Sequence, residues 1–310
     1  MYKRMLLPTD GSPCSEQTVR WGLNLAKILG AEVTFLHVVQ YNVAALHGVP
    51  TGGFYVADLE RDLQDAGREL LARAKAQATE LGVTCDVHMI EDDHPAQAIL
   101  RAEDTHDLTV MATHSRRGLD RLFLGSVTEA VLRRSDKPHL ILGCPAEDTP
   151  EDQVHVLASF EHLLLPTDGS ACSDHALDEG LELAKALGAK VTILHAVELP
   201  FTVYTMPDSM VYEPSIREDL RKVAQDTLDK ALSQAAKEGV EATIKLVDSG
   251  SARPDQAILD AEASADLTIM GTHGRRGFDR ALLGSVTERV LRRSPAPHLV
   301  LRCPNVEGPA

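Results

Sequence analysis

The sequence is poor in aromatic residues and in positive charge. Aromatic side chains make up 4% of the 310 residues, and 46 acidic residues outnumber 31 basic ones, so the formal net charge is −15. Side chains on which unpaired bases could stack are therefore scarce. The negative field of the chain also repels polyanions. We therefore expect no nucleic-acid partner.

Long apolar runs and closely spaced cysteines are also missing. No stretch approaches the roughly 20 consecutive apolar residues that span a bilayer, and the first apolar run is too short for the core of a signal peptide. The five cysteines include no C-x-x-C pair, which argues against a disulfide framework and against a zinc ribbon. We expect no membrane partner and a location in the reducing cytoplasm.

The two halves of the chain repeat the same sequence motifs. MLLPTDGS at residues 5–12 returns as LLLPTDGS at 163–170, and LGSVTE at 124–129 returns at 283–288. A repeat of this length indicates a duplicated domain, because solenoid repeats span about 20–50 residues. We predict a first domain over residues 1–146, an acidic and polar linker over 147–158, and a second domain over 159–310.

Each half alternates short apolar runs with helical patterns. In the first half, the run MLLP ends in the turn signal TDGS, and a helix is expected from Pro13 to Gly30. Four further strands and three further helices follow in alternation, and the second half repeats this order. Strands separated by helices pair in parallel with right-handed crossovers. The prediction is an α/β fold with two tandem doubly wound parallel five-stranded sheets, which is Rossmann-like.

In such sheets ligands bind beyond the carboxyl ends of the strands, where the strand order reverses. This rule points to the segments after the first strand and after the fourth strand of each half. In the second half the later segment contains Gly271 and Gly274, which permit close approach of the backbone to a ligand. Gly284 and Ser285 then open a helix, whose free N–H groups favour a phosphate. The alternative is that Ser285 is simply an N-cap.

Asp168 ends the first apolar run of the second half and would face the same crevice. A carboxylate near phosphates needs a cation between them, and Mg²⁺ commonly combines one carboxylate with phosphate oxygens. The alternative makes Asp168 an N-cap or an Asx-turn residue. No P-loop motif is present, and no G-x-G-x-x-G opens the first helix.

Residues 271–285 fit the pattern G-x2-G-x9-G-[ST], and on this motif and LPTDGS the chain resembles the universal stress protein family, in particular its tandem two-domain members. The resemblance implies an adenine-nucleotide α-hydrolase-like fold that binds ATP or another adenine nucleotide, with Mg²⁺ at Asp168 and Asp10. In the second half it assigns the nucleotide to Pro166, Thr167, Asp168, Met270, Gly271, His273, Gly274, Gly284, Ser285, Val286 and Thr287. In the first half it assigns Pro8, Thr9, Asp10, Val38, Met111, Gly125, Ser126, Val127 and Thr128.

The first half departs from this pattern at two glycines. Ala112 and Ser115 stand where the second half has Gly271 and Gly274. An extra Cβ can crowd a ligand, and a positive φ at Ser115 would cost of order 1 kcal/mol. The alternative is that Ser115 donates a hydrogen bond to a phosphate. We therefore expect a weaker or vestigial first site with an intact phosphate half.

Cysteines and histidines recur at matching positions. Cys14 and Cys172 open the first helix of each half, where a thiol pKa can fall and permit redox sensing; the alternative is a small, partly buried residue. His37 and His195 end the second strands and are expected to be buried or capping residues. The alternative is a metal site, which no i, i+4 pair or local carboxylate cluster supports.

Three function hypotheses fit these features to different degrees. The leading one is an ATP-binding regulator of the stress response, without catalytic residues and with at most slow ATP hydrolysis. The alternative is a scaffold or interaction protein that does not use a nucleotide. An adenylate-forming ligase is disfavoured, because neither S-G-G-x-D-S nor H-I-G-H is present. The resemblance further implies that the last strands of the two halves pair as an intrachain pseudo-dimer, with a homodimer of chains left open.

Overall fold

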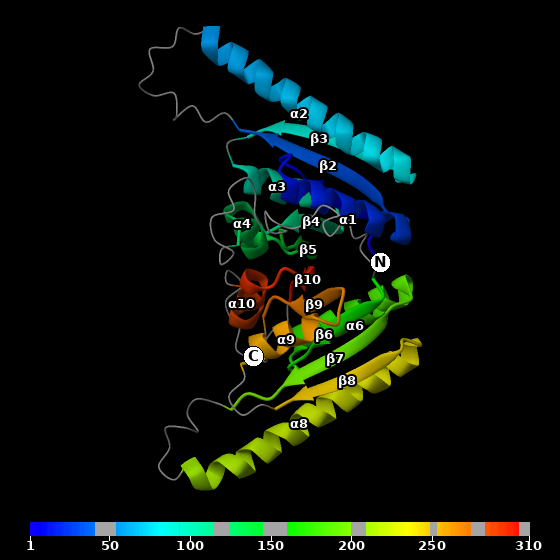
Figure 1. Cartoon of the computed structure of the whole chain (residues 1–310), viewed down its shortest axis with the longest axis vertical. Helices are drawn as coiled ribbons and strands as arrows, with labels where there is room; N and C mark the ends of the chain where they lie inside the picture. The colour runs from blue at the N-terminus through cyan, green and yellow to red at the C-terminus, as the bar shows by residue number, and fades with distance from the viewer. Residues whose placement is uncertain are drawn as a thin grey trace, which may run out of the picture. The chain divides into compact units, whose positions relative to one another are not determined.

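The computed structural model describes residues 1–40, 54–92, 94–113, 124–144, 160–199, 209–248, 253–273 and 283–303. By their contacts the residues divide into two compact units, 1–158 and 159–310 (Figure 1). Ser115, Gly274 and the expected linker at 147–158 lie outside the described residues. No helix in the described ranges is both long enough and apolar enough to cross a membrane.

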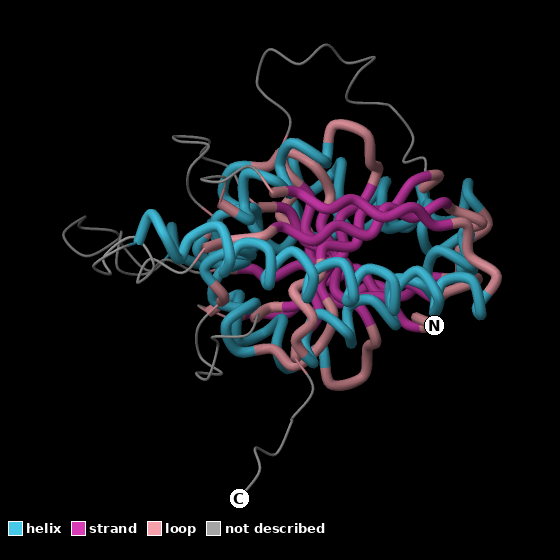
Figure 2. Tube along the Cα trace, turned by 90° about the horizontal axis from the view of Figure 1, so that it is seen from below, coloured by secondary structure: helices cyan, strands magenta, loops and turns pink. Residues whose placement is uncertain are grey.

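The first unit is a parallel sheet with the strand order β3-β2-β1-β4-β5. Helices α1 and α2 pack against each other, as do α3 and α4, and Figure 2 shows helices on both sides of the strands. The predicted doubly wound α/β fold is confirmed. The elements are β1 Arg4–Pro8, α1 Pro13–Leu29, β2 Glu32–Val39, α2 Phe54–Leu81, β3 Cys85–Glu91, α3 Pro95–Glu103, β4 Leu108–Ala112, α4 Ser126–Arg134 and β5 His139–Leu142.

The second unit repeats this arrangement with the order β10-β9-β6-β7-β8. Its order reverses between β6 and β9, so their carboxyl ends flank the crevice where a ligand is expected. The elements are β6 His162–Pro166, α6 Ala171–Leu187, β7 Lys190–Ala196, α8 Ser209–Glu238, β8 Ala242–Val247, α9 Pro254–Glu262, β9 Leu267–Gly271, α10 Ser285–Arg293 and β10 His298–Leu301.

Local signals set the bounds of the first helix in each unit. The Ser12 and Ser170 hydroxyl oxygens accept hydrogen bonds from backbone N–H groups three residues later, at 3.3 Å, and so cap α1 and α6. Gly30 and Gly188 end the two helices in the left-handed conformation, with φ of 63° and 67°. The expected helix from Pro13 to Gly30 is therefore confirmed.

A buried glutamate joins three elements in each unit. Glu262 of α9 accepts hydrogen bonds from Thr268 of β9 at 3.2 Å, from His298 of β10 at 2.8 Å, and from Ser294. Glu103 makes the same three contacts in the first unit. Although burial acts to raise their pKa values, the hydrogen bonds and the neighbouring histidine hold the pKa of both carboxyls below the ordinary value. These networks tie the last strand of each unit to its core.

Disulfide bonds correct the expectation from cysteine spacing. Cys14 is bonded to Cys144, and Cys172 to Cys303, while Cys85 is free. The bonded cysteines are 130 and 131 residues apart in sequence, so no local motif predicts either disulfide. They meet because the first helix of each unit begins at the same edge of the sheet where the last strand ends. The two readings of Cys14 and Cys172, as free sensor thiols or as merely small residues, do not describe these bonded cysteines.

Candidate functional site

A cavity of about 720 Å³ opens in the second unit at the carboxyl ends of β6, β7 and β9. It therefore lies at the reversal of strand order, where such folds bind ligands. All the described residues assigned to the second site line it: Pro166, Thr167, Asp168, Met270, Gly271, His273, Gly284, Ser285, Val286 and Thr287. Sequence reasoning thus brought together residues from three separate stretches of the chain.

Asp168 lies on one side of this cavity, at the turn between β6 and α6. Its Oδ1 accepts a hydrogen bond from the Ser170 N–H at 3.0 Å, which is an Asx turn. The N-cap of α6 is Ser170 instead, so the Asx-turn interpretation of Asp168 is right and the N-cap interpretation is wrong. Burial and the nearby carboxylates of Asp178 and Asp168 raise the pKa of Asp174. Of these three carboxylates, Asp168 is the one that lines the cavity.

The start of α10 forms the opposite side. Its N-cap is Gly284, and no side chain caps the helix; the alternative that Ser285 is the N-cap is therefore wrong. The first N–H groups of α10 are left for a ligand or solvent, and the helix dipole adds positive potential there. A Cβ on Gly284 would lie 2.6 Å from the Thr272 carbonyl oxygen. Glycine is therefore required by close packing of this turn.

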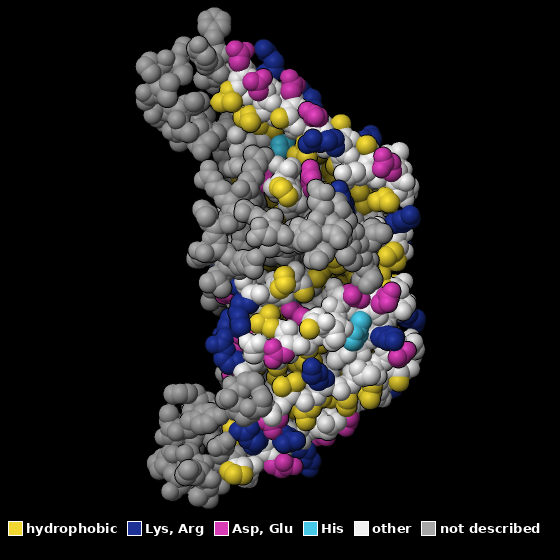
Figure 3. Space-filling model, viewed as in Figure 1, with side chains coloured by type: hydrophobic (Ala, Val, Ile, Leu, Met, Phe, Trp, Pro, Cys, Tyr) yellow, Lys and Arg dark blue, Asp and Glu magenta, His cyan; other side chains and the backbone are white. Residues whose placement is uncertain are grey.

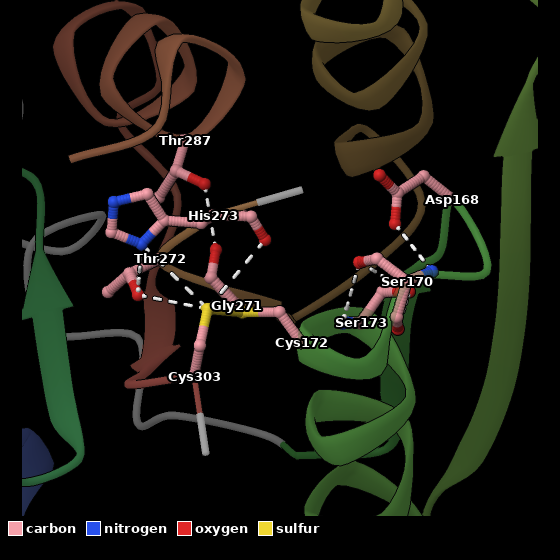
Figure 4. Close-up of a disulfide and its surroundings, with 9 residues drawn as sticks. All are labelled: Asp168, Ser170, Cys172, Ser173, Gly271, Thr272, His273, Thr287 and Cys303. Carbon is pink, nitrogen blue, oxygen red and sulfur yellow. Dashed lines mark hydrogen bonds between the residues drawn. A yellow bond between two sulfur atoms is a disulfide. The ribbon is translucent and has the colours of Figure 1, made fainter. Parts of the chain in front are cut away.

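Thr287 ties the helix start to the end of β9. Its hydroxyl donates to the Gly271 carbonyl oxygen at 2.8 Å, so that proton is directed at the protein backbone. The disulfide Cys172–Cys303 lies between Thr287 and His273 on one side and Asp168 and Ser170 on the other (Figure 4). A Cβ on Gly271 would lie 2.5 Å from Cys172 Sγ. The disulfide therefore lies directly against the end of β9, which lines the cavity.

Apolar side chains form the rest of the wall, and sequence reasoning missed most of them. Leu194, Ile258 and Met270 belong to one buried cluster, with Ala196 and Val286 packed against it. Two residues of the long helix α8 also reach the cavity. In the sequence, each of these apolar residues is indistinguishable from an ordinary core residue, because the cavity forms only where separate elements meet. The lining residues without a prior assignment are Ser173, Leu194, His195, Ala196, Val197, Glu198, Leu220, Val223, Pro254, Ile258, Leu283 and Arg289.

The first unit repeats the polar half of this arrangement. Asp10 forms the same Asx turn with Ser12 at 3.0 Å, and Gly125 is the N-cap of α4 without a side-chain cap. The Thr128 hydroxyl donates to the Ala112 carbonyl oxygen at 2.7 Å. The remaining assigned residues lie at the ends of β1, β2 and β4 and in the first turn of α4: Pro8, Thr9, Val38, Met111, Ser126 and Val127.

Histidines do not assemble a metal site in the described part of the chain, where no group of three or more His, Cys, Asp or Glu residues could hold an ion. His37 is buried, and its Nδ1 donates to the Thr9 carbonyl oxygen at 2.8 Å. His195 is buried as well. The expectation that these two histidines are buried is confirmed.

Comparison with known proteins identifies the family of both halves of the chain. The model of the universal stress protein family matches residues 1–143 and 159–302. A universal stress protein of Mycobacterium tuberculosis is 26% identical over 309 residues, covering 96% of this chain and 96% of that relative. One from Methanocaldococcus jannaschii is 34% identical over 149 residues, which are 48% of this chain and 86% of the relative. The crystal structure of a universal stress protein from Archaeoglobus fulgidus shares the fold, with a TM-score of 0.68 at 24% identity over 97% of this chain and 98% of that one. The chain belongs to the universal stress protein family.

Proposed function

We propose that the second unit binds an adenine nucleotide, ATP above all, and that the protein acts as a nucleotide-dependent regulator in the stress response. The observation that carries this proposal is the pairing of an apolar cavity with the uncapped start of α10. The apolar wall suits a base and a ribose, and the free N–H groups suit phosphates. The match of residues 271–285 to the family's nucleotide motif supports the same ligand.

Mg²⁺ fits this proposal through Asp168. The Asp168 carboxylate lines the cavity from the turn after β6, and the start of α10 lies across from it. A hard cation held by one carboxylate and by phosphate oxygens is the usual coordination of Mg²⁺ in such sites. In this proposal Asp168 supplies one ligand and the phosphates supply others, so Mg²⁺ is expected to bind together with the nucleotide and not alone.

The cavity carries no arrangement of base and nucleophile among its described residues. His273 Nδ1 contacts the Thr272 hydroxyl at 3.0 Å and the Cys303 sulfur at 3.8 Å, which belong to the protein framework. Fast hydrolysis needs a positioned base or an activated water. We therefore propose a binding protein whose ATP hydrolysis is slow at most.

The first test denatures the purified protein and quantifies released nucleotide per chain by chromatography and mass spectrometry. About one nucleotide per chain supports a working second site with a weak first one, and about two shows that Ala112 and Ser115 are tolerated. No nucleotide, with no binding of added ATP and Mg²⁺, overturns the proposal and favours the scaffold alternative.

Gly284→Asp tests the site itself. The new side chain meets the Thr272 carbonyl oxygen and places a negative charge at the helix start. We expect loss of nucleotide from the second site in equilibrium dialysis. Gly125→Asp, the same change at the start of α4, is the matched control and should leave the second site intact. Unchanged nucleotide affinity in Gly284→Asp contradicts the site assignment.

A further inference from the structure

A cluster of arginines adjoins the cavity and has no counterpart in the first unit. Asp255, in the first turn of α9, is fully buried. Arg253 donates to both of its carboxylate oxygens, at 3.1 and 2.7 Å, and Arg293 donates to Oδ2 at 3.1 Å. Arg289 completes the cluster with Nε 3.2 Å from Oδ1. Three guanidinium groups thus surround one carboxylate, and positive charge remains in excess.

Arg289 is the member of this cluster that lines the cavity. Its Nε forms an ion pair with Asp255 that lacks the alignment of a hydrogen bond. The side chain is 39% exposed, whereas that of Asp255 has no exposed surface. The buried carboxylate therefore holds the guanidinium from one side and leaves another side open to the cavity.

Helix geometry directs Arg289 toward the start of α10. Side chains in a helix lean toward its N-terminus, so a residue covers the turn that precedes it. Arg289 lies one turn beyond Ser285 and Val286, which line the same cavity. Its guanidinium is thus expected beside the uncapped N–H groups, where a phosphate would bind. Figure 3 shows a group of basic side chains over α10, the helix that carries Arg289, Arg292 and Arg293.

The remaining charges of the cavity fit this placement. Asp168 stands at the opposite side, and Glu198 also lines the cavity. Hydrogen bonding to Asp255, with a smaller contribution from Glu198, raises the pKa of Arg253. A guanidinium beside the helix start is therefore a cation well placed for phosphate oxygens.

The first unit lacks three of the four members of this cluster and retains only Arg134, at the position of Arg293. Ala96 and Ala130 stand at the positions of Asp255 and Arg289 in the repeat, and His94 stands at that of Arg253. The first unit forms the same fold without them. The cluster is therefore not required for folding of this kind of domain.

We propose that Arg289, positioned by Asp255, is a specificity-determining residue that contacts the phosphate groups of the nucleotide in the second cavity. This inference rests on the proposed function. With Arg289 in contact, the affinity of the second site for a nucleotide should increase more steeply with the number of its phosphates than with the start of α10 alone. A guanidinium presents a planar pair of donors to phosphate oxygens, so lysine cannot fully replace it.

The test titrates ATP, ADP, AMP and adenosine, with Mg²⁺ present, into the full chain and its variants by calorimetry. Arg289→Met removes the charge and keeps much of the length. We expect about a five- to thirtyfold loss of ATP affinity, from a charge-assisted contact weakened by partial exposure, and little change for adenosine. Arg289→Lys should recover part of the loss. Because the first unit is identical in all variants, any difference reports the second site.

Arg292→Met is the matched control. It removes an arginine from the same helix, where it pairs with Glu288 at 2.9 Å and does not line the cavity. We expect its ATP affinity to equal that of the unmodified chain. Equal loss of affinity for ATP and adenosine in Arg289→Met would show a merely structural role and overturn the inference, as would unchanged ATP affinity. After either outcome, nucleotide binding by the unmodified chain still supports the proposed function. If the unmodified chain binds no nucleotide, both the proposed function and the inference about Arg289 are overturned.

Discussion

The two disulfides predict a large dependence of stability on redox conditions. Each closes a loop of about 130 residues, which is most of its unit. In the chain-entropy description, a cross-link over such a loop stabilises the folded state by about 5 kcal/mol at 25 °C. Replacing Cys172 and Cys303 together by serine should therefore lower the free energy of unfolding of the second unit by up to that amount.

The assay is urea unfolding followed by circular dichroism. With a slope of about 2 kcal/mol per molar urea, the full effect would move the midpoint of the second unit by about 2.5 M. Reduction of the unmodified chain should produce a comparable shift in both units. Cys85→Ser is the matched control, because Cys85 is free and partly buried; its midpoint should move little.

Thiol counting provides the sharper test of the same reasoning. The chain contains five cysteines, and the structure leaves Cys85 as the free one. Protein purified without reductant, unfolded in denaturant and alkylated should therefore carry one label per chain, and five labels after reduction. Five labels without reduction would refute the disulfides, and an unchanged urea midpoint on reduction would refute the stability argument built on them.

Two other contacts lead to further predictions. Because Glu103 and Glu262 have pKa values below the ordinary value in the folded protein, they contribute stability above about pH 5, and this contribution is lost as pH falls through the folded pKa values; equal urea midpoints at pH 6 and pH 3 would contradict this. Gly271→Ala should destabilise the second unit by about 1–3 kcal/mol, since its Cβ would lie 2.5 Å from Cys172 Sγ. Ala112→Gly in the first unit is the matched control for thermal unfolding, and a Gly271→Ala melting temperature equal to that of the unmodified chain would count against the clash.

Sequence periodicity was sufficient for the fold because each signal is local. Each signal lies in or next to the element that it defines. For α6 the signals are the N-cap Ser170 and the C-cap Gly188, and for a strand the signal is its own apolar run. The doubly wound topology then follows from the alternation of strands and helices. The repeat supports each predicted strand and helix, because the same pattern occurs at the matching position of the other half.

The parts that sequence reasoning missed depend on distant residues. Cys172 and Cys303 are 131 residues apart, and Glu262 meets His298 and Ser294 across two elements. No periodicity encodes such contacts, because they arise when the carboxyl or amino ends of parallel strands come together. The motif residues of the cavity were found because a fixed spacing marks them, whereas Arg289 has no such mark.

The comparison of the two units separates what the fold needs from what the second cavity adds. A buried aspartate without cationic partners would cost several kcal/mol, so Asp255 is sustainable only together with its arginines. The first unit has alanine at the positions of both Asp255 and Arg289, and so it avoids that cost altogether, although it retains Arg134 at the position of Arg293. Caps, glutamate networks and disulfides, in contrast, occur in both units. The features that both units share therefore stabilise the domain, and the cluster confined to the second unit lies where it can act on the ligand of the cavity.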